Sequence, residues 1–366
     1  MDRLTRRSFV RLAGASAATV LGAQMLAAEQ AAAHPAAVGR ATGLAQMPPL
    51  DPQMQAVIDE LVALEAPKLT DMTPFNARQT TPLVQAVNAV LTRQGKPPQE
   101  PVGNVAHRLI PGGAGQQMLV RFYQPVGDGP FPTLVYFHGG GWVIANLDVY
   151  DASCRALVNA ANCAVMSVAY RLAPEQKFPA AAEDAFAAYK WLHDNAALVR
   201  TDPARIAVGG ESAGGNLAAV TALLARDRKA PMPVHQMLIY PITNYAFDTP
   251  SYRQFVDAMP LNTPMMQYFW ANYLRRPADG ANPYASPMRA SSLAGLPPAT
   301  VINAEVDPLR DEGEAYAARL REAGVPVTAT RYSGVTHEFF SMGAIVDKAK
   351  QAVAEAAAGL KGAFGS

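Results

Sequence analysis

The sequence is poor in cysteine and in net charge, and each shortage excludes a class of protein. Its 366 residues include two cysteines, Cys154 and Cys163, whose spacing is not that of a zinc site. Basic residues number 31 against 30 acidic ones, and no basic cluster follows the N-terminal segment. Because such a balance creates no field that attracts polyanions, we expect no nucleic-acid partner.

The two cysteines also give little reason to expect a disulfide. An oxidising compartment would permit one, but Cys154 falls within a predicted helix and Cys163 just before a predicted strand. We interpret both as small buried side chains. Hydrophobic residues, in contrast, make up 50% of the chain, which is enough to bury a large core.

The first 33 residues resemble an export signal. Residues 5–11 read TRRSFVR, similar to the twin-arginine signature, and an apolar stretch of small residues follows at 12–28. Alanines at 31–33 provide a cleavage site. An uncleaved membrane anchor is the alternative, but the stretch is short and rich in alanine and glycine. We expect cleavage, a linker at 34–50, and a periplasmic or secreted product without a stable membrane anchor.

Two helices are expected before the first strand. An Asp-Pro pair at 51–52 provides an N-cap and a first-turn proline, and apolar residues then recur at helical spacing. A Thr-Pro pair at 81–82 starts a second helix. We interpret the segment at about 51–100, together with an insertion at 245–284 rich in aromatic residues and proline, as a cap that roofs an apolar substrate pocket.

After residue 104 the pattern changes to strands that alternate with helices. Alternating segments at 104–110 and 116–124 predict a hairpin across a Pro-Gly-Gly turn. Short apolar runs, each followed by a helical stretch, then predict a mostly parallel sheet with helices on both faces. The expected strands are 133–137, 164–170, 205–208, 237–240, 300–304 and 327–332, and the expected helices are 148–161, 179–195, 212–227, 313–323 and 345–360.

Residues 210–214 read GESAG and match the pattern G-x-S-x-G. The match alone is weak, because chance produces it in about one chain of this length in ten. Its context is stronger, since Ser212 falls between a predicted strand and a predicted helix, on a tight turn that needs glycines. Such a turn raises the Ser212 hydroxyl above the sheet and places the Ala213 N–H at a helix N-terminus, where developing negative charge is stabilised.

A second glycine-rich signal follows the first parallel strand. His138 is followed by Gly139, Gly140 and Gly141, a combination much rarer by chance than G-x-S-x-G. Glycines let the backbone pass close to a substrate with its N–H groups free, and with the Ala213 N–H they would form an oxyanion hole. The alternative interpretation is a flexible turn.

A serine nucleophile needs a base, and the base needs an acid that orients it. His337 is expected in a loop after the last strand, whereas the other histidines fall in the removable segment, the glycine-rich loop or predicted elements: His34, His138, His107, His193 and His235. Asp307 follows another strand at the same sheet edge, and its place just before a helix favours it over Glu305 and Asp311. We predict that His337 takes the Ser212 proton and that Asp307 holds the imidazole.

Together these motifs resemble the hormone-sensitive lipase family of bacterial esterases, from about residue 51 to the C-terminus. The resemblance is carried by HGGGW at 138–142, YRLAPE at 170–175, FPAA at 178–181 with ED at 183–184, GESAGG at 210–215, DPLRDE at 307–312 and HEF at 337–339. It implies an α/β-hydrolase fold, with a mostly parallel eight-stranded sheet flanked by helices and a helical cap. It also implies oxyanion donors at Gly140, Gly141 and Ala213. Gly139 and Trp142 are further candidates for the oxyanion hole or the substrate site, and a packing role is the alternative for Trp142.

The resemblance further implies hydrolysis of short- to medium-chain acyl esters, without cofactor or metal. One departure is Glu211, because the family commonly has Asp or Thr before the nucleophile. An exported deacetylase or an amidase would share the triad, and a non-catalytic small-molecule receptor would lose its histidine, which this chain retains. A homodimer through an edge strand or the last helix is a further expectation.

Overall fold

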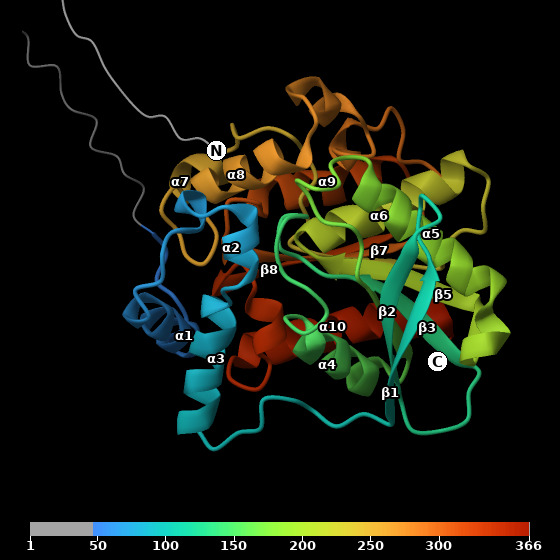
Figure 1. Cartoon of the computed structure of the whole chain (residues 1–366), viewed down its shortest axis with the longest axis horizontal. Helices are drawn as coiled ribbons and strands as arrows, with labels where there is room; N and C mark the ends of the chain where they lie inside the picture. Colours follow the sequence, from blue (N-terminus) through green and yellow to red (C-terminus); the bar gives the residue numbers. More distant parts are fainter. Residues whose placement is uncertain (1–46, 366) are drawn as a thin grey trace, which may run out of the picture. The chain divides into compact units, whose positions relative to one another are not determined.

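The computed structural model describes residues 47–365 and folds them around one eight-stranded sheet (Figure 1). The predicted signal at 1–33 and most of the linker at 34–50 lie outside the described residues. The strand order is β1-β2-β4-β3-β5-β6-β7-β8. Strand β2 is antiparallel to both of its neighbours, and all other neighbouring pairs are parallel. The predicted fold class is therefore confirmed.

The strands carry the following bounds: β1 Asn104–Pro111, β2 Gln117–Gln124, β3 Phe131–Phe137, β4 Ala164–Val168, β5 Thr201–Glu211, β6 Gln236–Ile239, β7 Ala299–Val306 and β8 Val327–Thr336. The α-helices are α1 Pro52–Ala63, α2 Pro74–Arg78, α3 Pro82–Arg93, α4 Asp151–Ala161, α5 Ala180–Asp194, α6 Ala213–Asp227, α7 Pro250–Gln254, α8 Thr263–Tyr273, α9 Arg310–Glu322 and α10 Asp347–Phe364. Five short 3-10 helices, η1 Leu69–Asp71, η2 Ala196–Val199, η3 Pro277–Ala281, η4 Pro287–Arg289 and η5 Phe339–Met342, complete the described part of the chain.

Both faces of the central strands are buried, as expected for parallel strands with helical crossovers. Because successive side chains alternate between faces, Val135 and Phe137 of β3 pack in one apolar cluster with α5, α6 and α9. Leu134 and Tyr136 of the same strand pack in a second cluster with α4 and α10. Figure 1 shows these two helical layers on opposite sides of the sheet.

Strand β5 is longer than the predicted strand at 205–208, because it begins at Thr201 and ends at Glu211. The first residues of the strand are polar, so the apolar run that indicates a strand begins only later. Two of these polar residues, Asp202 and Arg205, form an ion pair at 2.7 Å. The strand still pairs with β3 across a register shift, with Phe131 opposite Thr201. Its extension carries the chain directly into the turn that holds Ser212.

The predicted cap segment at 51–100 contains α1, α2 and α3, of which α2 was not predicted. Arg78, the last residue of α2, donates to the carbonyl oxygens of Val143 and Ala173, both at 2.7 Å. It also pairs with Glu175 at 2.7 Å. A single side chain thus ties the cap segment to the loop that contains the glycine-rich motif.

The YRLAPE and ED motifs have a structural role around the buried Asp184 carboxylate. Arg171 contacts this carboxylate through its backbone N–H, Nε and Nη2 at 3.0, 2.8 and 2.9 Å. Gly113 N–H and Gln116 Nε2, from the β1–β2 turn, reach it at 2.7 and 2.9 Å. Burial acts to raise the pKa of Asp184, but these donors hold the pKa below its ordinary value.

We predict that Asp184→Ala lowers the free energy of unfolding by about 3–5 kcal/mol, because it leaves the Arg171 guanidinium and two further donors without their acceptor. The neighbouring Glu183 makes a more exposed pair with Arg228, so Glu183→Ala serves as the control, with a loss below about 1 kcal/mol. Urea denaturation of both variants measures the difference. Equal losses in the two variants would contradict the role of Asp184.

Candidate active site

The predicted site residues lie in loops at the carboxyl ends of four parallel strands. Gly140 and Gly141 follow β3, Ser212 follows β5, Asp307 follows β7 and His337 follows β8. Carboxyl ends of parallel strands meet at one edge of a sheet, where α/β folds place their sites. The sheet topology alone therefore brings segments about 200 residues apart in sequence to one place.

Ser212 occupies a tight turn between β5 and α6. Its backbone is left-handed, with φ 56° and ψ −117°, and it caps the N-terminus of α6. A Cβ atom on Gly210 or Gly214 would lie 2.3 or 1.8 Å from the Phe137 carbonyl oxygen of β3. The turn is thus possible only with glycine at both positions, and it leaves the Ser212 side chain at the wall of a cavity.

Three backbone N–H groups are free to receive an anionic oxygen near Ser212. Within residues 47–365, no hydrogen bond engages the N–H of Gly140, Gly141 or Ala213. Ala213 is the first residue of α6, where helical N–H groups have no partner and the helix dipole is positive. Gly140 and Gly141 have φ angles of 89° and 57°, and a Cβ on Gly141 would lie 2.2 Å from the Phe269 ring. The loop therefore passes close to α8 only because it lacks side chains.

Two further candidates, Gly139 and Trp142, lie away from the cavity wall. The Trp142 side chain is fully buried and stacks on Tyr273, with ring centroids 4.0 Å apart. The expectation that it lines the substrate site therefore needs correction, because its left-handed φ of 60° and its stacking partner hold the indole in the core. The Gly139 carbonyl accepts from His138 Nδ1 at 2.9 Å, which makes Gly139 part of the loop's internal framework.

The structure brings His337 and Asp307 into direct contact. Nδ1 of His337 lies 2.7 Å from Oδ2 of Asp307, and both side chains are buried. The rival acids are engaged elsewhere, because Glu305 accepts from the Gly334 N–H at 2.7 Å and Asp311 pairs with Arg310 at 2.8 Å. Of the three acids considered from the sequence, Asp307 is the one placed to orient the imidazole.

Burial and charge act in opposite directions on His337. Burial acts to lower the pKa of His337, whereas the Asp307 carboxylate, and more weakly Glu338 and Glu211, raise the pKa above its ordinary value. The net rise in pKa means that the surrounding carboxylates favour the imidazolium. A base that takes a proton from serine needs this stabilisation.

Glu211, the departure noted in the sequence, is completely buried below the site. Its carboxylate accepts from Tyr136 at 2.5 Å and from the Tyr240 hydroxyl. Burial, and then the nearby Glu338 carboxylate, raise the pKa of Glu211 to about 7, although the tyrosine donors oppose the rise. The sequence predicted the presence of this acid but not its two tyrosine partners, which come from β3 and from the residue after β6.

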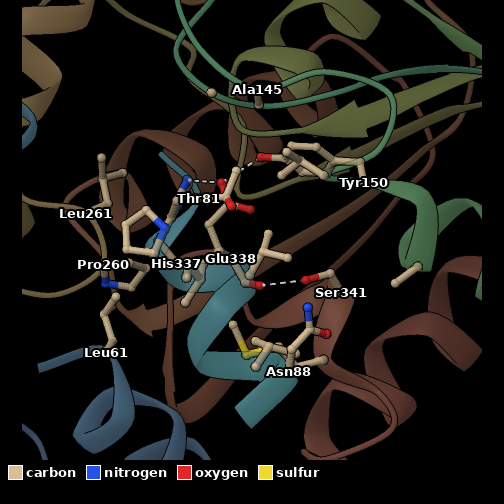
Figure 2. Close-up of a pocket in the computed structure, with 18 of the residues that line it drawn as sticks. Leu61, Thr81, Asn88, Ala145, Tyr150, Pro260, Leu261, His337, Glu338 and Ser341 are labelled. Carbon is tan, nitrogen blue, oxygen red and sulfur yellow. Dashed lines mark hydrogen bonds and ion pairs between the residues drawn. The ribbon is translucent and has the colours of Figure 1, made fainter. Parts of the chain in front are cut away.

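Glu338 is a functional candidate that sequence reasoning missed. It follows His337 directly, its backbone is left-handed with φ 68°, and its side chain lines the same cavity as Ser212. Figure 2 shows its carboxylate between the Tyr150 hydroxyl and the His337 ring. Its position next to His337 was the one sequence signal for a role at the site. The left-handed backbone conformation at Glu338 could not be predicted from the sequence.

A cavity of about 1570 Å³ contains Ser212, His337, Gly140 and Gly141 in its wall. The wall is mainly apolar, and its apolar part includes residues of α1, α3, α8 and the loop before α8: Leu61, Leu83, Val87, Leu261, Met265 and Phe269. Helices α4 and α10 and the segments at 65–72 and 96–101 also line the cavity. Figure 2 shows α3 and the loop with Pro260 and Leu261 on either side of His337. The segments interpreted as a cap from the sequence thus supply the apolar wall opposite the catalytic loops.

Residues 47–365 contain no group of three or more His, Cys, Asp or Glu side chains that could hold a metal ion. No helix in that range is sufficiently long and apolar to cross a membrane. Cys154 and Cys163 are both free and buried.

Comparison with known proteins gives consistent results. Residues 134–341 match the family described as alpha/beta hydrolase fold. The chain is 46% identical over 245 residues to the carboxylic ester hydrolase LipN of Mycobacterium tuberculosis, and the match covers 65% of each chain, slightly less than two thirds. It is 38% identical over 295 residues to an arylesterase of Saccharolobus solfataricus, which covers 80% of this chain and 92% of that protein.

Solved structures agree with these relatives. A hyperthermophilic esterase from Pyrobaculum calidifontis superposes with a TM-score of 0.79 at 41% identity, over 86% of this chain and 98% of the esterase. The chain belongs to the α/β-hydrolase fold family. Within that family it is a carboxylic ester hydrolase of the group similar to hormone-sensitive lipase.

The buried Glu211 predicts a stability difference that depends on pH. Its folded pKa of about 7 lies above the ordinary glutamate value of 4.5, so the folded state binds the proton more tightly than the unfolded state. Stability therefore falls as pH rises from the ordinary pKa through the folded pKa. Glutamine has no proton to lose, so Glu211→Gln removes this pH-dependent loss of stability. From pH 5 to pH 8 the free energy of unfolding of the variant should rise by about 1–3 kcal/mol relative to that of wild type. Denaturation of both proteins at the two pH values tests this, and a pH-independent difference would contradict it.

Proposed function

We propose that the protein hydrolyses short- to medium-chain acyl esters through an acyl-enzyme on Ser212, with His337 as base and acid and Asp307 as the orienting acid. The observation that carries this assignment is the 2.7 Å contact of Asp307 with His337 at the edge of a cavity that also contains Ser212. The names of the carboxylesterase relatives support the ester as the substrate class.

In the first half-reaction, Ser212 Oγ attacks the ester carbonyl carbon while His337 Nε2 accepts the hydroxyl proton. The carbonyl oxygen becomes an oxyanion and receives hydrogen bonds from the N–H groups of Gly140, Gly141 and Ala213. Asp307 holds Nδ1 protonated and stabilises the imidazolium. Collapse of the tetrahedral intermediate expels the alcohol, which takes the proton from Nε2, and leaves the acyl group on Ser212.

In the second half-reaction, water replaces the alcohol. His337 Nε2 accepts a proton from water as its oxygen attacks the acyl carbon, and the same three N–H groups stabilise the second oxyanion. The C–O bond to Ser212 then breaks, and the serine recovers its proton from His337. Both steps use only side chains, backbone amides and water, and the mainly apolar cavity of about 1570 Å³ offers room for the acyl and alcohol parts.

We predict that Ser212→Ala lowers kcat/KM on p-nitrophenyl butyrate by at least about 10⁴-fold without loss of fold, because no other group replaces the nucleophile. Asp307→Asn should cost about 10³- to 10⁴-fold, because the amide cannot hold the required tautomer of His337. Ser291→Ala, at an exposed position, is the matched control with unchanged activity.

A series of p-nitrophenyl esters from acetate to palmitate measures these effects together with the preference for acyl length. Rates highest from acetate to octanoate support the proposed substrate class. Full residual activity in Ser212→Ala would overturn the assignment of the nucleophile. An amide or an acetylated glycan hydrolysed in preference to every ester would move the proposal to an amidase or a deacetylase.

We further propose export of the folded protein by the twin-arginine route to the periplasm or beyond. The proposal is supported by the TRRSFVR run at 5–11 and the following stretch of small apolar residues. Expressed in a bacterium with this pathway, the chain should appear outside the cytoplasm with a lower mass, and replacement of Arg6 and Arg7 by lysine should prevent this. Full-length protein in the cytoplasm of the unaltered strain would contradict the proposal.

A further inference from the structure

The residue after His337 combines an acidic side chain with a backbone conformation that side chains rarely adopt. Glu338 has a φ of 68°, in the left-handed region where glycine carries no steric penalty. A residue held in such a conformation persists only when its surroundings fix it, and such residues cluster at functional sites. The Glu338 side chain lines the same cavity as Ser212 and lies beside His337.

One hydrogen bond holds this carboxylate and a second holds the backbone of Glu338. The Tyr150 hydroxyl donates to Oε1 of Glu338 at 2.8 Å, and the Ser341 hydroxyl donates to the Glu338 backbone oxygen at 3.3 Å (Figure 2). The same Oε1 lies 3.7 Å from Nε2 of His337. Since Asp307 contacts Nδ1 at 2.7 Å, the imidazole lies between two carboxylates, one near each ring nitrogen.

The groups around Glu338 leave its charge largely uncompensated. The titratable groups that face it are Asp307 after β7, Glu211 at the end of β5, and the tyrosines at 150, 170 and 240. Among residues 47–365, the one ion pair that Glu338 forms is with His337. The imidazole is therefore the cationic partner that its negative charge stabilises.

We propose that Glu338 is a positioning residue for His337: held by Tyr150, its carboxylate places a negative charge beside Nε2 and sets the pH at which the imidazole accepts the serine proton. This inference rests on the proposed function of His337 as the base. Glu338 takes no proton from the substrate. The proton moves from Ser212 Oγ to His337 Nε2 and then to the leaving alcohol, while Glu338 stabilises the imidazolium between the two transfers.

The sign of the effect follows from charge. A carboxylate beside Nε2 stabilises protonated His337, and protonated His337 cannot act as base. Removing that charge should lower the pKa of His337, to which Glu338 contributes an upward shift after burial and Asp307. The acid limb of the activity profile should then move to lower pH.

The test compares kcat/KM for p-nitrophenyl butyrate from pH 5 to pH 9 in wild type, Glu338→Gln and Glu338→Gly. Glutamine keeps an acceptor for Tyr150 without the charge, and glycine suits the left-handed backbone, so at least one neutral variant should fold. Both should move the acid limb to lower pH by about half a pH unit or more. Glu338→Asp keeps a carboxylate, so its acid limb should lie between those of the neutral variants and wild type.

Glu305→Gln is the matched control, because Glu305 lies at the same sheet edge but bonds to the Gly334 N–H instead of the imidazole. Its acid limb should coincide with that of wild type. A merely structural role of Glu338 would lower kcat without moving the limb. An unmoved limb in both neutral variants, or a shift to higher pH, would overturn the inference.

A second readout separates this inference from the proposed function. In protein labelled with ¹⁵N-histidine, the His337 signal, assigned by its loss in His337→Gln, should titrate at lower pH in Glu338→Gln than in wild type. Absence of ester hydrolysis with this NMR shift present would refute the proposed function and keep the link between Glu338 and His337. Hydrolysis that depends on Ser212, with the NMR titration unchanged, would refute the inference alone.

Discussion

The active site depends on how closely the β5–α6 turn approaches the end of β3. Gly210 and Gly214 lie so near the Phe137 carbonyl oxygen that neither position has room for a Cβ atom. This contact forces Ser212 into a left-handed backbone conformation and begins α6 at the next residue. The serine hydroxyl and the free Ala213 N–H are therefore placed by the same packing constraint, before any substrate is present.

Electrostatics around His337 form the second organising feature. Asp307 and Glu338, from the loops after β7 and β8, each lie near one ring nitrogen of His337. Glu211, at the end of β5, acts on the imidazole through its charge. Tyrosine hydroxyls donate to Glu338 and Glu211. Burial disfavours the ionised form of each carboxylate, and nearby carboxylates disfavour it further. Both effects raise the pKa of Glu211 and of Glu338. In the proposed mechanism Asp307 orients the base, which leaves Glu338 to set the pH range in which the base works.

Much of this arrangement is encoded locally in the sequence. The glycine-rich motifs and the strand before Ser212 predicted the fold. The positions of Asp307 and His337 between strands and helices predicted candidate residues that the structure places at one edge of the sheet. These signals are readable because a tight turn restricts residue type at the turn itself. The length of β5 was missed because its first residues are polar and partly exposed, and the short helix α2 because five residues give too little periodicity.

Other features depend on packing between distant segments. Trp142 follows the glycine run, yet its indole packs against Tyr273, about 130 residues further along the chain. The tyrosines that bind Glu211 and Glu338 likewise come from separate elements, and the alternation of apolar residues does not specify which hydroxyl meets which carboxylate. The sequence therefore predicts the catalytic groups better than the shell that adjusts their charge.

The most direct test of the central claim is to locate the nucleophile chemically. Diethyl p-nitrophenyl phosphate transfers its phosphoryl group to an activated serine and releases p-nitrophenol. Mass spectrometry of the treated and digested protein should find one diethylphosphoryl group per chain, on the peptide that contains Ser212, and far slower labelling in His337→Gln. A label on another residue, or equal labelling without His337, would contradict the account of Ser212 as a nucleophile activated by His337.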